Sequence, residues 1–314
     1  NWEGTYFDFD HRRVVSMARR AAALGAELFV LDDGWFGARD DDHAGLGDYT
    51  VNRRKLPKGL EGLAAEITGL GLKFGLWFEP EMVNPDSDLY RAHPDWAIAV
   101  PGRTPSEERF QLVLDLTRHE VRDHLVENVS AILDRVPISY VKWDANRTFS
   151  DQWSAVTPAG ELHHRYVLGL YEVLRRIFGP RPHVLLESCA SGGNRFDLGM
   201  LCFSPQIWAS DCTDPIERLS IQGGLSYLYP PSTMGAHVTA SPSAQTLRDT
   251  PLSTRFNVAA FGLLGYELDP TDLTREERHR IRAQIAFYKE HRRLLQYGRF
   301  RRHDPVRGNQ VPWS

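Results

Sequence analysis

Short apolar runs alternate along this chain with longer stretches in which apolar residues recur every three or four positions. Runs of the first kind are typical of buried strands, and stretches of the second kind are typical of amphipathic helices. The strands predicted in this way cover residues 5–9, 28–31, 73–79, 139–143, 183–187, 206–210, 233–238 and 262–268.

Helices are predicted between these strands, and several of them have recognisable start signals. Asp10 is placed to cap a helix through its carboxylate. Thr117 with Glu120, and Thr274 with Glu277, have the spacing of a capping box. The expected helices cover residues 11–24, 60–70, 121–132, 166–178 and 215–228, with a last helix that ends near residue 295.

The alternation of strand and helix repeats without an intervening linker, which predicts one (β/α)8 barrel over residues 1–314. A doubly wound parallel sheet is the alternative, and the lack of a glycine-rich phosphate fingerprint after the first strand counts against it. Residues 111–116 also look like a strand. Because parallel neighbours need a crossover helix between them, we expect this segment in a long loop outside the main sheet.

Composition narrows the class of partner. The net charge is −4 and the pI about 6.3, which favours neither nucleic acid nor an anionic membrane as a partner. No apolar run has the length of a membrane span. The three cysteines do not form a disulfide framework or a metal motif, which favours a reducing, cytoplasmic location. The chain begins with Asn1, so the sequence carries no information on a signal peptide.

Acidic side chains collect where the predicted strands end, and tryptophans are interleaved with them. In a barrel these strand ends meet at one mouth. Carboxylates accept hydrogen bonds from sugar hydroxyls and an indole ring packs against a sugar face, so the combination favours carbohydrate binding. Core packing is the alternative for each tryptophan alone. The residues are Asp8, Asp32, Asp33, Glu79, Asp144, Glu187 and Asp211, with Trp2, Trp35, Trp77, Trp143 and Trp208.

Lys142 and Asp144 lie two positions apart at the end of one predicted strand, on the same face. A cation beside a carboxylate lowers its pKa and keeps it ionised, as a nucleophile requires. A strand-end salt bridge without a catalytic role is the alternative interpretation.

The motifs in order resemble bacterial α-galactosidases of glycoside hydrolase family 36. The resemblance runs from Trp2 to about Pro270 and rests on Trp2, Leu31-Asp32-Asp33-Gly34-Trp35-Phe36-Gly37, Gly75-Leu76-Trp77-Phe78-Glu79-Pro80-Glu81-Met82-Val83, Lys142-Trp143-Asp144-Ala145-Asn146-Arg147, Glu187-Ser188-Cys189-Ala190-Ser191-Gly192-Gly193 and Ser210-Asp211-Cys212-Thr213-Asp214.

The resemblance implies a retaining hydrolase of terminal α-galactosides such as melibiose or raffinose, without cofactor or metal. It makes Asp144 the nucleophile and Asp211 the acid/base, whose pKa burial and the charge of Asp144 would raise. It assigns Asp32 and Asp33 to the 4- and 6-hydroxyls of galactose. It implies further sugar contacts from Trp2, Trp77, Arg109, Lys142, Asn146, Cys189 and Gly192.

The resemblance also implies a longer protein. Family members carry a β-sandwich before the barrel and a smaller β domain after it, so we expect this chain to be the catalytic domain of a larger protein, which we expect to form a homo-oligomer. Ala145, Cys212 and Asn194 depart from the residues usual in the family. These departures bear on acceptor specificity and leave the catalytic pair intact.

Other functions remain open at this point. Galactosyl transfer of the raffinose-synthase type would use the same two carboxylates. A non-catalytic sugar-binding barrel would require one of them to be lost, and a metal-dependent barrel enzyme would lose activity to a chelator. The acidic segment 40–43 is interpreted as a solvated loop rather than a metal site. Cys189 is interpreted as a sugar contact rather than a nucleophile.

Overall fold

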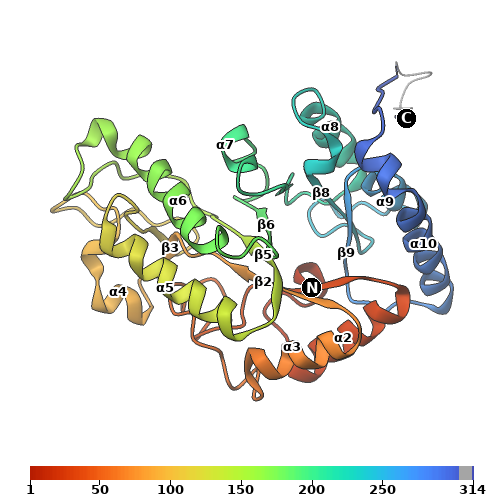
Figure 1. Cartoon of the computed structure of the whole chain (residues 1–314), viewed down its shortest axis with the longest axis horizontal. Helices are drawn as coiled ribbons and strands as arrows, with labels where there is room; N and C mark the ends of the chain where they lie inside the picture. The colour runs from red at the N-terminus through yellow and green to blue at the C-terminus, as the bar shows by residue number, and fades with distance from the viewer. Residues whose placement is uncertain (304–312) are drawn as a thin grey trace. The chain divides into compact units, whose positions relative to one another are not determined.

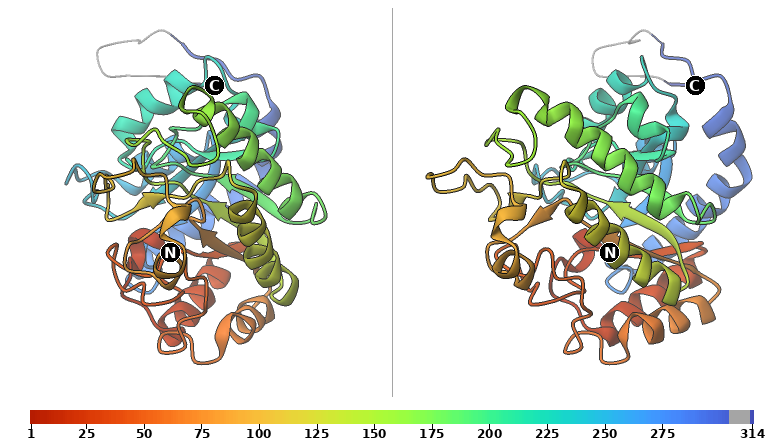
Figure 2. Two further views of the ribbon diagram at one scale, coloured as in Figure 1. Left: turned by 90° about the vertical axis from the view of Figure 1, so that its left-hand side faces the viewer. Right: turned by 60° about the vertical axis from the view of Figure 1, so that its left-hand side comes forward.

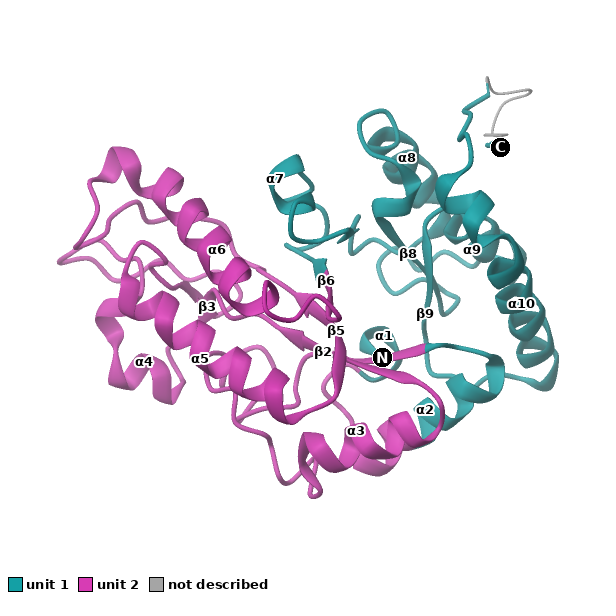
Figure 3. Cartoon of the chain, in the orientation of Figure 1, with its two compact units in different colours: residues 1–5, 16–27, 187–314 teal, residues 6–15, 28–186 magenta. Residues whose placement is uncertain are grey.

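The computed structural model describes residues 1–303 and 313–314, and it divides into two compact units (Figure 3). Unit 1 comprises Asn1–Thr5, Ser16–Glu27 and Glu187–Ser314, and unit 2 comprises Tyr6–Val15 and Leu28–Leu186. Each unit has parallel strands joined by helices, so each is built as an α/β fold.

The sheet of unit 2 contains β1 (Leu28–Leu31), β2 (Lys73–Phe78) and β5 (Ile138–Trp143), with β2 in the middle. Strands β2 and β5 are labelled next to each other in Figure 1. All three are parallel, and helices α3 (Gly59–Gly69) and α5 (His119–Arg135) provide the crossovers. Strand β2 is buried from its second residue onward, as expected for the central strand of a parallel sheet. These three strands and both helices confirm the predicted elements.

Between β2 and α5 lies a separate antiparallel pair, β3 (Met82–Val83) with β4 (Leu112–Val113). Short helices α4 (Asp88–Ala92) and η1 (Pro94–Trp96) occupy the intervening loop. The prediction that residues 111–116 stay outside the main sheet is therefore confirmed.

Two helices of unit 2 lie side by side, α5 and α6 (Leu162–Phe178), the latter preceded by η2 (Ala159–Glu161) (Figure 2). The ion pair between Arg176 and Asp123 at 2.6 Å connects them. The predicted capping box of α5 is wrong. Both the amide and the hydroxyl of Thr117 donate to Asp115 Oδ1, and this local turn competes with the cap.

The strands of unit 1 are also parallel, in the order β6 (Leu185–Ser188), β7 (Gln206–Trp208), β8 (Met234–Thr239) and β9 (Leu263–Glu267). Strand β6 begins in unit 2 and pairs with β7 through its last two residues, Glu187 and Ser188. The helices are α7 (Leu198–Leu201), α8 (Pro215–Leu225), η3 (Pro231–Thr233), α9 (Leu252–Ala259) and α10 (Arg275–Tyr297). Strand β8 packs against α9 and α10 in a core that includes Val238, Phe256 and Ile281.

The N-terminal segment differs from the prediction. Residues 5–9 do not form a strand, because helix α1 (Trp2–Thr5) ends there and Tyr6 takes a left-handed φ of 46°. Helix α2 (His11–Leu24) follows, with Asp10 Oδ1 accepting from the Arg13 amide as predicted. The capping box of Thr274 and Glu277 at the start of α10 is also confirmed. No helix among the described residues combines the length and apolarity that a bilayer span requires.

Candidate active site

Asp144 follows directly after β5, and three hydrogen bonds fix it there. Its amide donates to the Phe78 carbonyl at 2.8 Å, which extends the pairing of β5 with β2 by one residue. Its carboxylate accepts from the Trp77 indole at Oδ2 (3.1 Å) and from the Ala145 amide at Oδ1 (2.9 Å). The side chain is buried, so both oxygens are oriented by neutral donors at the end of the strand.

Lys142 and Asp32 form an ion pair across the same sheet. Trp77 on β2 is in register with Lys142 on β5, and Asp32 follows the end of β1. Lys142 Nζ lies 2.9 Å from Asp32 Oδ2. The sequence predicted this cation as the partner of Asp144, whereas the ion pair seen here joins it to the first acid of the Asp-Asp pair.

Asp33, the second acid, is held by Arg39. The guanidinium donates from Nε and from Nη2 to the Asp33 carboxylate, at 3.1 Å for Nε to Oδ1 and 2.9 Å for Nη2 to Oδ2. Both residues are buried, Arg39 completely. Arg39 was not among the predicted site residues, since nothing in its local pattern distinguishes it from a surface arginine.

The side chain of Arg109 is held by Asp42, which lies in the loop between β1 and α3. Asp42 accepts from both Arg109 Nη2 (3.2 Å) and Arg39 Nη2 (3.3 Å), so one carboxylate joins the two guanidinium groups. Arg109 and Phe110 both have left-handed φ angles, 52° and 59°. The side-chain amide of Asn84 donates from Nδ2 to the Phe110 carbonyl at 2.7 Å, which holds this uncommon backbone conformation.

Glu79 directly follows the end of β2 and was predicted only as one of the strand-end carboxylates. It is buried and accepts hydrogen bonds from the Asn146 amide and from Gln111 Nε2. Burial, with a further contribution from the charge of Asp144, raises the pKa of Glu79 to about 8. Through its hydrogen bond with the Asn146 amide, Glu79 fixes the backbone of Asn146, a predicted sugar contact.

In unit 1, Asp211 lies three residues after the end of β7. Trp208, the last residue of that strand, donates from Nε1 to Asp211 Oδ1 at 2.9 Å. Asp211 is exposed, whereas the sequence predicted it to be buried.

The turn that carries Cys189 and Gly192 packs against the backbone of Asp211. Cys189 is buried directly after β6. Gly192 has a φ of 87°, and a Cβ at this position would lie 2.8 Å from Ser210 Cα and 3.0 Å from the Asp211 nitrogen. Only glycine permits this approach, which explains the residue type without assigning it a sugar contact.

Trp2 is half-buried in α1, and its neighbour Glu3 connects this helix to the segment after Asp211. Glu3 Oε1 accepts from the Thr213 hydroxyl and from Gln245 Nε2, both at 2.9 Å. Burial and the charge of Glu267 raise the pKa of Glu3 to about 7.

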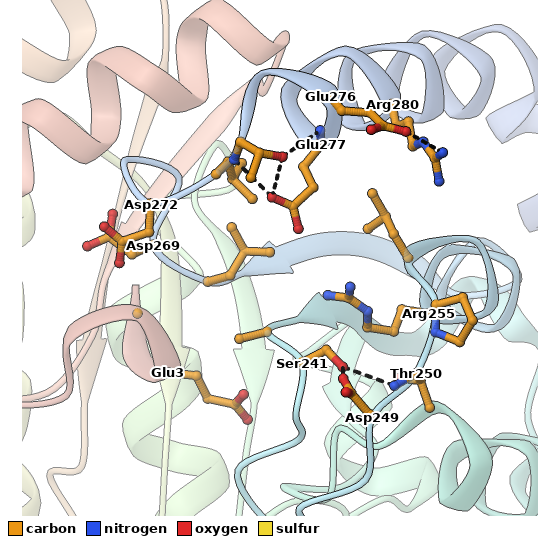
Figure 4. Close-up of a pocket in the computed structure, with 17 residues that line it drawn as sticks. Glu3, Ser241, Asp249, Thr250, Arg255, Asp269, Asp272, Glu276, Glu277 and Arg280 are labelled. Carbon is orange, nitrogen blue, oxygen red and sulfur yellow. Dashed lines mark hydrogen bonds and ion pairs between the residues drawn. The ribbon is translucent and has the colours of Figure 1, made fainter.

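A separate cavity of about 620 Å³ lies in unit 1, between the segments that follow β8 and β9 (Figure 4). Its charged lining residues are Glu3, Asp249, Arg255, Asp269, Asp272, Glu276, Glu277 and Arg280. Among the described residues that line it none is aromatic, so this cavity lacks the ring surface that sugar sites use.

The predicted site residues therefore fall into two groups. Unit 2 brings together seven of them, and unit 1 carries the rest. The first group is Asp32, Asp33, Trp77, Arg109, Lys142, Asp144 and Asn146, and the second is Trp2, Cys189, Gly192 and Asp211.

Comparison with known proteins identifies the family of the chain. The sequence profile described as Melibiase matches residues 1–298. The α-galactosidase AgaA of Geobacillus stearothermophilus is 55% identical, over 100% of this chain and 44% of its own length. Mel36A of Lactobacillus acidophilus is 49% identical, over 100% of this chain and 43% of its own length.

Solved structures agree with the sequence comparison. The crystal structure of the GH36 α-galactosidase AgaA superimposes with a TM-score of 0.97 over 100% of this chain and 44% of that one, at 55% identity. A variant of AgaA in complex with raffinose gives 0.97 over the same shares, at 54% identity. The chain spans less than half the length of these relatives. With a profile match over nearly all of its residues and relatives at this level of identity, the chain belongs to the Melibiase family, whose members compared here are α-galactosidases of glycoside hydrolase family 36.

Proposed function

We propose that this chain is the catalytic (β/α)8 barrel of a retaining α-galactosidase that hydrolyses terminal, non-reducing α-D-galactosides. Parallel strands with helical crossovers in both units, together with the TM-score of 0.97 to AgaA, support the barrel. We propose residues 1–314 as one catalytic domain of a longer protein with flanking β domains; the chain covers 44% of AgaA.

The observation that carries the proposal is the fixed carboxylate of Asp144 in unit 2. Both of its oxygens accept from neutral N–H donors, so the carboxylate keeps a defined orientation. Asp144 would attack the anomeric carbon and form a galactosyl ester, while the bond to the leaving oxygen breaks. A carboxylate held by two donors at a buried strand end has the fixed geometry that such an attack needs.

Asp211 would supply the proton to the leaving oxygen and later remove one from water, which then cleaves the ester. Because Oδ1 accepts the Trp208 N–H, a proton on Asp211 is best accommodated on Oδ2. Asp211 is exposed, so in the proposed mechanism the bound sugar would cover its carboxyl group and favour the protonated form.

Specificity for galactose would come from Asp32 and Asp33. Each of these buried carboxylates is paired with a cation, Asp32 with Lys142 and Asp33 with Arg39. An ionised carboxylate aimed at the axial 4-hydroxyl rejects the equatorial epimer, because it would then be left without a partner. Trp2, Trp77, Arg109, Lys142, Asn146, Cys189 and Gly192 are proposed as further sugar contacts.

The names of the relatives bear on the reaction and its substrates. The curated relatives at 48–55% identity are named α-galactosidases, which supports hydrolysis over the transfer reaction of raffinose synthases. The raffinose and stachyose in structures of AgaA variants support small oligosaccharides as substrates. Cys189, Cys202 and Cys212 are present as thiols, which is in keeping with the proposed cytoplasmic location. A homo-oligomer of the full-length protein remains an expectation.

The test is release of nitrophenol from the α-galactoside, with the α-glucoside and the α-N-acetylgalactosaminide as controls. We expect turnover of the galactoside alone, with galactose as the product even at high concentrations of an acceptor sugar. Transfer products in place of galactose would support the synthase alternative, and comparable turnover of the glucoside would contradict the proposed substrate.

A further inference from the structure

Asp211 lies in a segment without regular secondary structure. Strand β7 ends at Trp208 and helix α8 begins at Pro215 with Asp214 as its N-cap, so neither strand pairing nor the hydrogen bonds of α8 hold residues 209–213. A general acid must stay within a fraction of an ångström of its working position. Other contacts must therefore fix the backbone on both sides of Asp211.

Arg218 makes these contacts from α8. Its guanidinium donates to the carbonyls of Ser210 (Nη2, 2.6 Å) and Cys212 (Nε, 2.8 Å), the two residues that flank Asp211. A third hydrogen bond, from Nη1, reaches the Gly235 carbonyl on β8 at 3.1 Å. Arg218 is only 3% exposed, so a buried guanidinium spans the irregular segment and attaches it to the sheet of unit 1.

The same guanidinium packs on the side-chain partner of Asp211. Arg218 Cζ lies 4.5 Å from the centre of the Trp208 ring, and the Trp208 indole donates to Asp211 Oδ1. The Trp208 ring is also packed against His237 at 4.4 Å between ring centres. Arg218 thus contacts both the main chain beside Asp211 and the residue that orients its carboxyl group.

We propose that Arg218 is a positioning residue for the acid/base Asp211, holding the carboxyl group where it can deliver a proton to the leaving oxygen. The proposal rests on the proposed function, since it requires Asp211 to be the general acid. It uses the planar fork of arginine: two of its donors bind two carbonyls of one segment, which the single ammonium of lysine cannot reproduce.

A purely structural role of Arg218 and a positioning role predict different effects of its substitution on activity. If Arg218 only stabilises unit 1, its loss lowers activity on every substrate equally. If it positions the acid, its loss matters most when the leaving group needs a proton. The glycosidic oxygen of melibiose needs one, whereas fluoride leaves with its bonding electrons and without protonation.

The experiment compares kcat/KM for melibiose and for α-galactosyl fluoride in the full-length protein, for wild type, Arg218→Met, Arg218→Lys and Asp211→Ala. For Arg218→Met we expect a loss of ~100-fold or more on melibiose and less than ~10-fold on the fluoride, within the range that general acid catalysis supplies. Arg218→Lys keeps the charge and should show the same selectivity. Azide, which needs no general base, should raise kcat on the fluoride and give α-galactosyl azide.

Arg255→Met is the matched control. Arg255 is a second buried arginine of unit 1, 9% exposed, and donates to the carbonyl of Thr239 beside the cavity of Figure 4. Its loss should affect both substrates to the same degree. Melting temperatures of all variants separate a general loss of stability from the selective effect.

Equal losses on melibiose and on the fluoride for both Arg218 variants would overturn the positioning role. If Arg218→Met does not fold, the same comparison of the two substrates is made with Arg218→Lys. If Asp211→Ala also shows no selectivity between the two leaving groups, it is the assignment of Asp211, and with it the proposed mechanism, that fails.

Discussion

The indole of Trp77 donates to Asp144 Oδ2 at 3.1 Å, while its own main-chain carbonyl accepts from the indole of Trp35 at 2.9 Å. The residue whose ring orients the proposed nucleophile is thus held at its main chain by a second buried tryptophan. We expect Trp77→Phe to lower kcat/KM on the α-galactoside by ~10- to 150-fold, because one hydrogen bond to a charged group contributes about 1.5–3 kcal/mol and packing is retained. Trp35→Phe, as the control, should lower the melting temperature more than it lowers kcat/KM. Full activity of Trp77→Phe would contradict this role.

The nucleophile itself is tested by chemical rescue. Asp144→Ala should abolish turnover while galactose binding, measured by calorimetry, persists, because the proposed sugar contacts of Asp32 and Asp33 are unchanged. Azide should restore part of the turnover by attacking the anomeric carbon from the vacated face, and the product should be β-galactosyl azide. An α-configured azide from this variant would show that another residue is the nucleophile.

Sugar specificity is tested at Asp32. We expect Asp32→Asn to lower kcat/KM on the α-galactoside by at least ~100-fold, or ~2.7 kcal/mol, since a charge-assisted hydrogen bond in a dry site is lost. Lys142 then loses its ion-pair partner, so thermal unfolding is measured in parallel. Asp8→Asn is the matched control, since Asp8 is paired with Arg13 at the surface. Activity of Asp32→Asn within a few-fold of wild type would exclude this assignment.

Glu79 should make the stability depend on pH. Its folded-state pKa of about 8 lies above the ordinary value of 4.5, so the folded protein binds more protons than the unfolded chain between these values. The stabilisation is complete below pH ~4.5 and is lost as the pH rises to ~8, on the order of a few kcal/mol. This loss of stability is measured by urea unfolding of wild type and Glu79→Gln at pH 5 and at pH 8. The stability of wild type relative to the variant should fall from pH 5 to pH 8.

The control for Glu79 is Glu277→Gln. The Thr274 amide and hydroxyl bind the Glu277 carboxylate and lower its pKa. The stabilisation that Glu277 provides is therefore lost only as the pH falls below the ordinary glutamate pKa of 4.5. The difference between wild type and Glu277→Gln should therefore be constant from pH 5 to 8. The same constancy for Glu79→Gln would contradict the raised pKa.

The mechanism also predicts a distance. In a crystal structure of the full-length protein with a bound inhibitor, the carboxyl groups of Asp144 and Asp211 should be ≈ 5–5.5 Å apart, the spacing of retaining glycosidases. A separation near ~9 Å in a well-ordered site would leave room for a water molecule and would favour inversion instead. The configuration of galactose at the first moment of release, followed by NMR, gives an independent check.

Local signals in the sequence predicted much of the fold. Strands β1, β2 and β5 were found because buried parallel strands are continuous apolar runs, and α10 because its capping box involves residues three apart. The same kind of signal failed at Thr117. The nearby Asp115 accepts its hydroxyl, and two local hydrogen-bonding patterns of similar energy cannot be ranked from the sequence.

The strand-end positions of Asp32, Asp33 and Asp144 were likewise determined by the sequence, because a strand ends where its apolar run ends. Which cation each acid meets was decided only by the tertiary structure. Lys142 is two residues from Asp144, yet its ion pair is with Asp32, because the register of β1, β2 and β5 brings chain segments far apart in sequence onto one face of the sheet. Arg39 and Arg218 were not predicted for the same reason. The position of a buried guanidinium depends on carbonyls and carboxylates that are distant in sequence, and the hydrophobic pattern of its own segment does not indicate them.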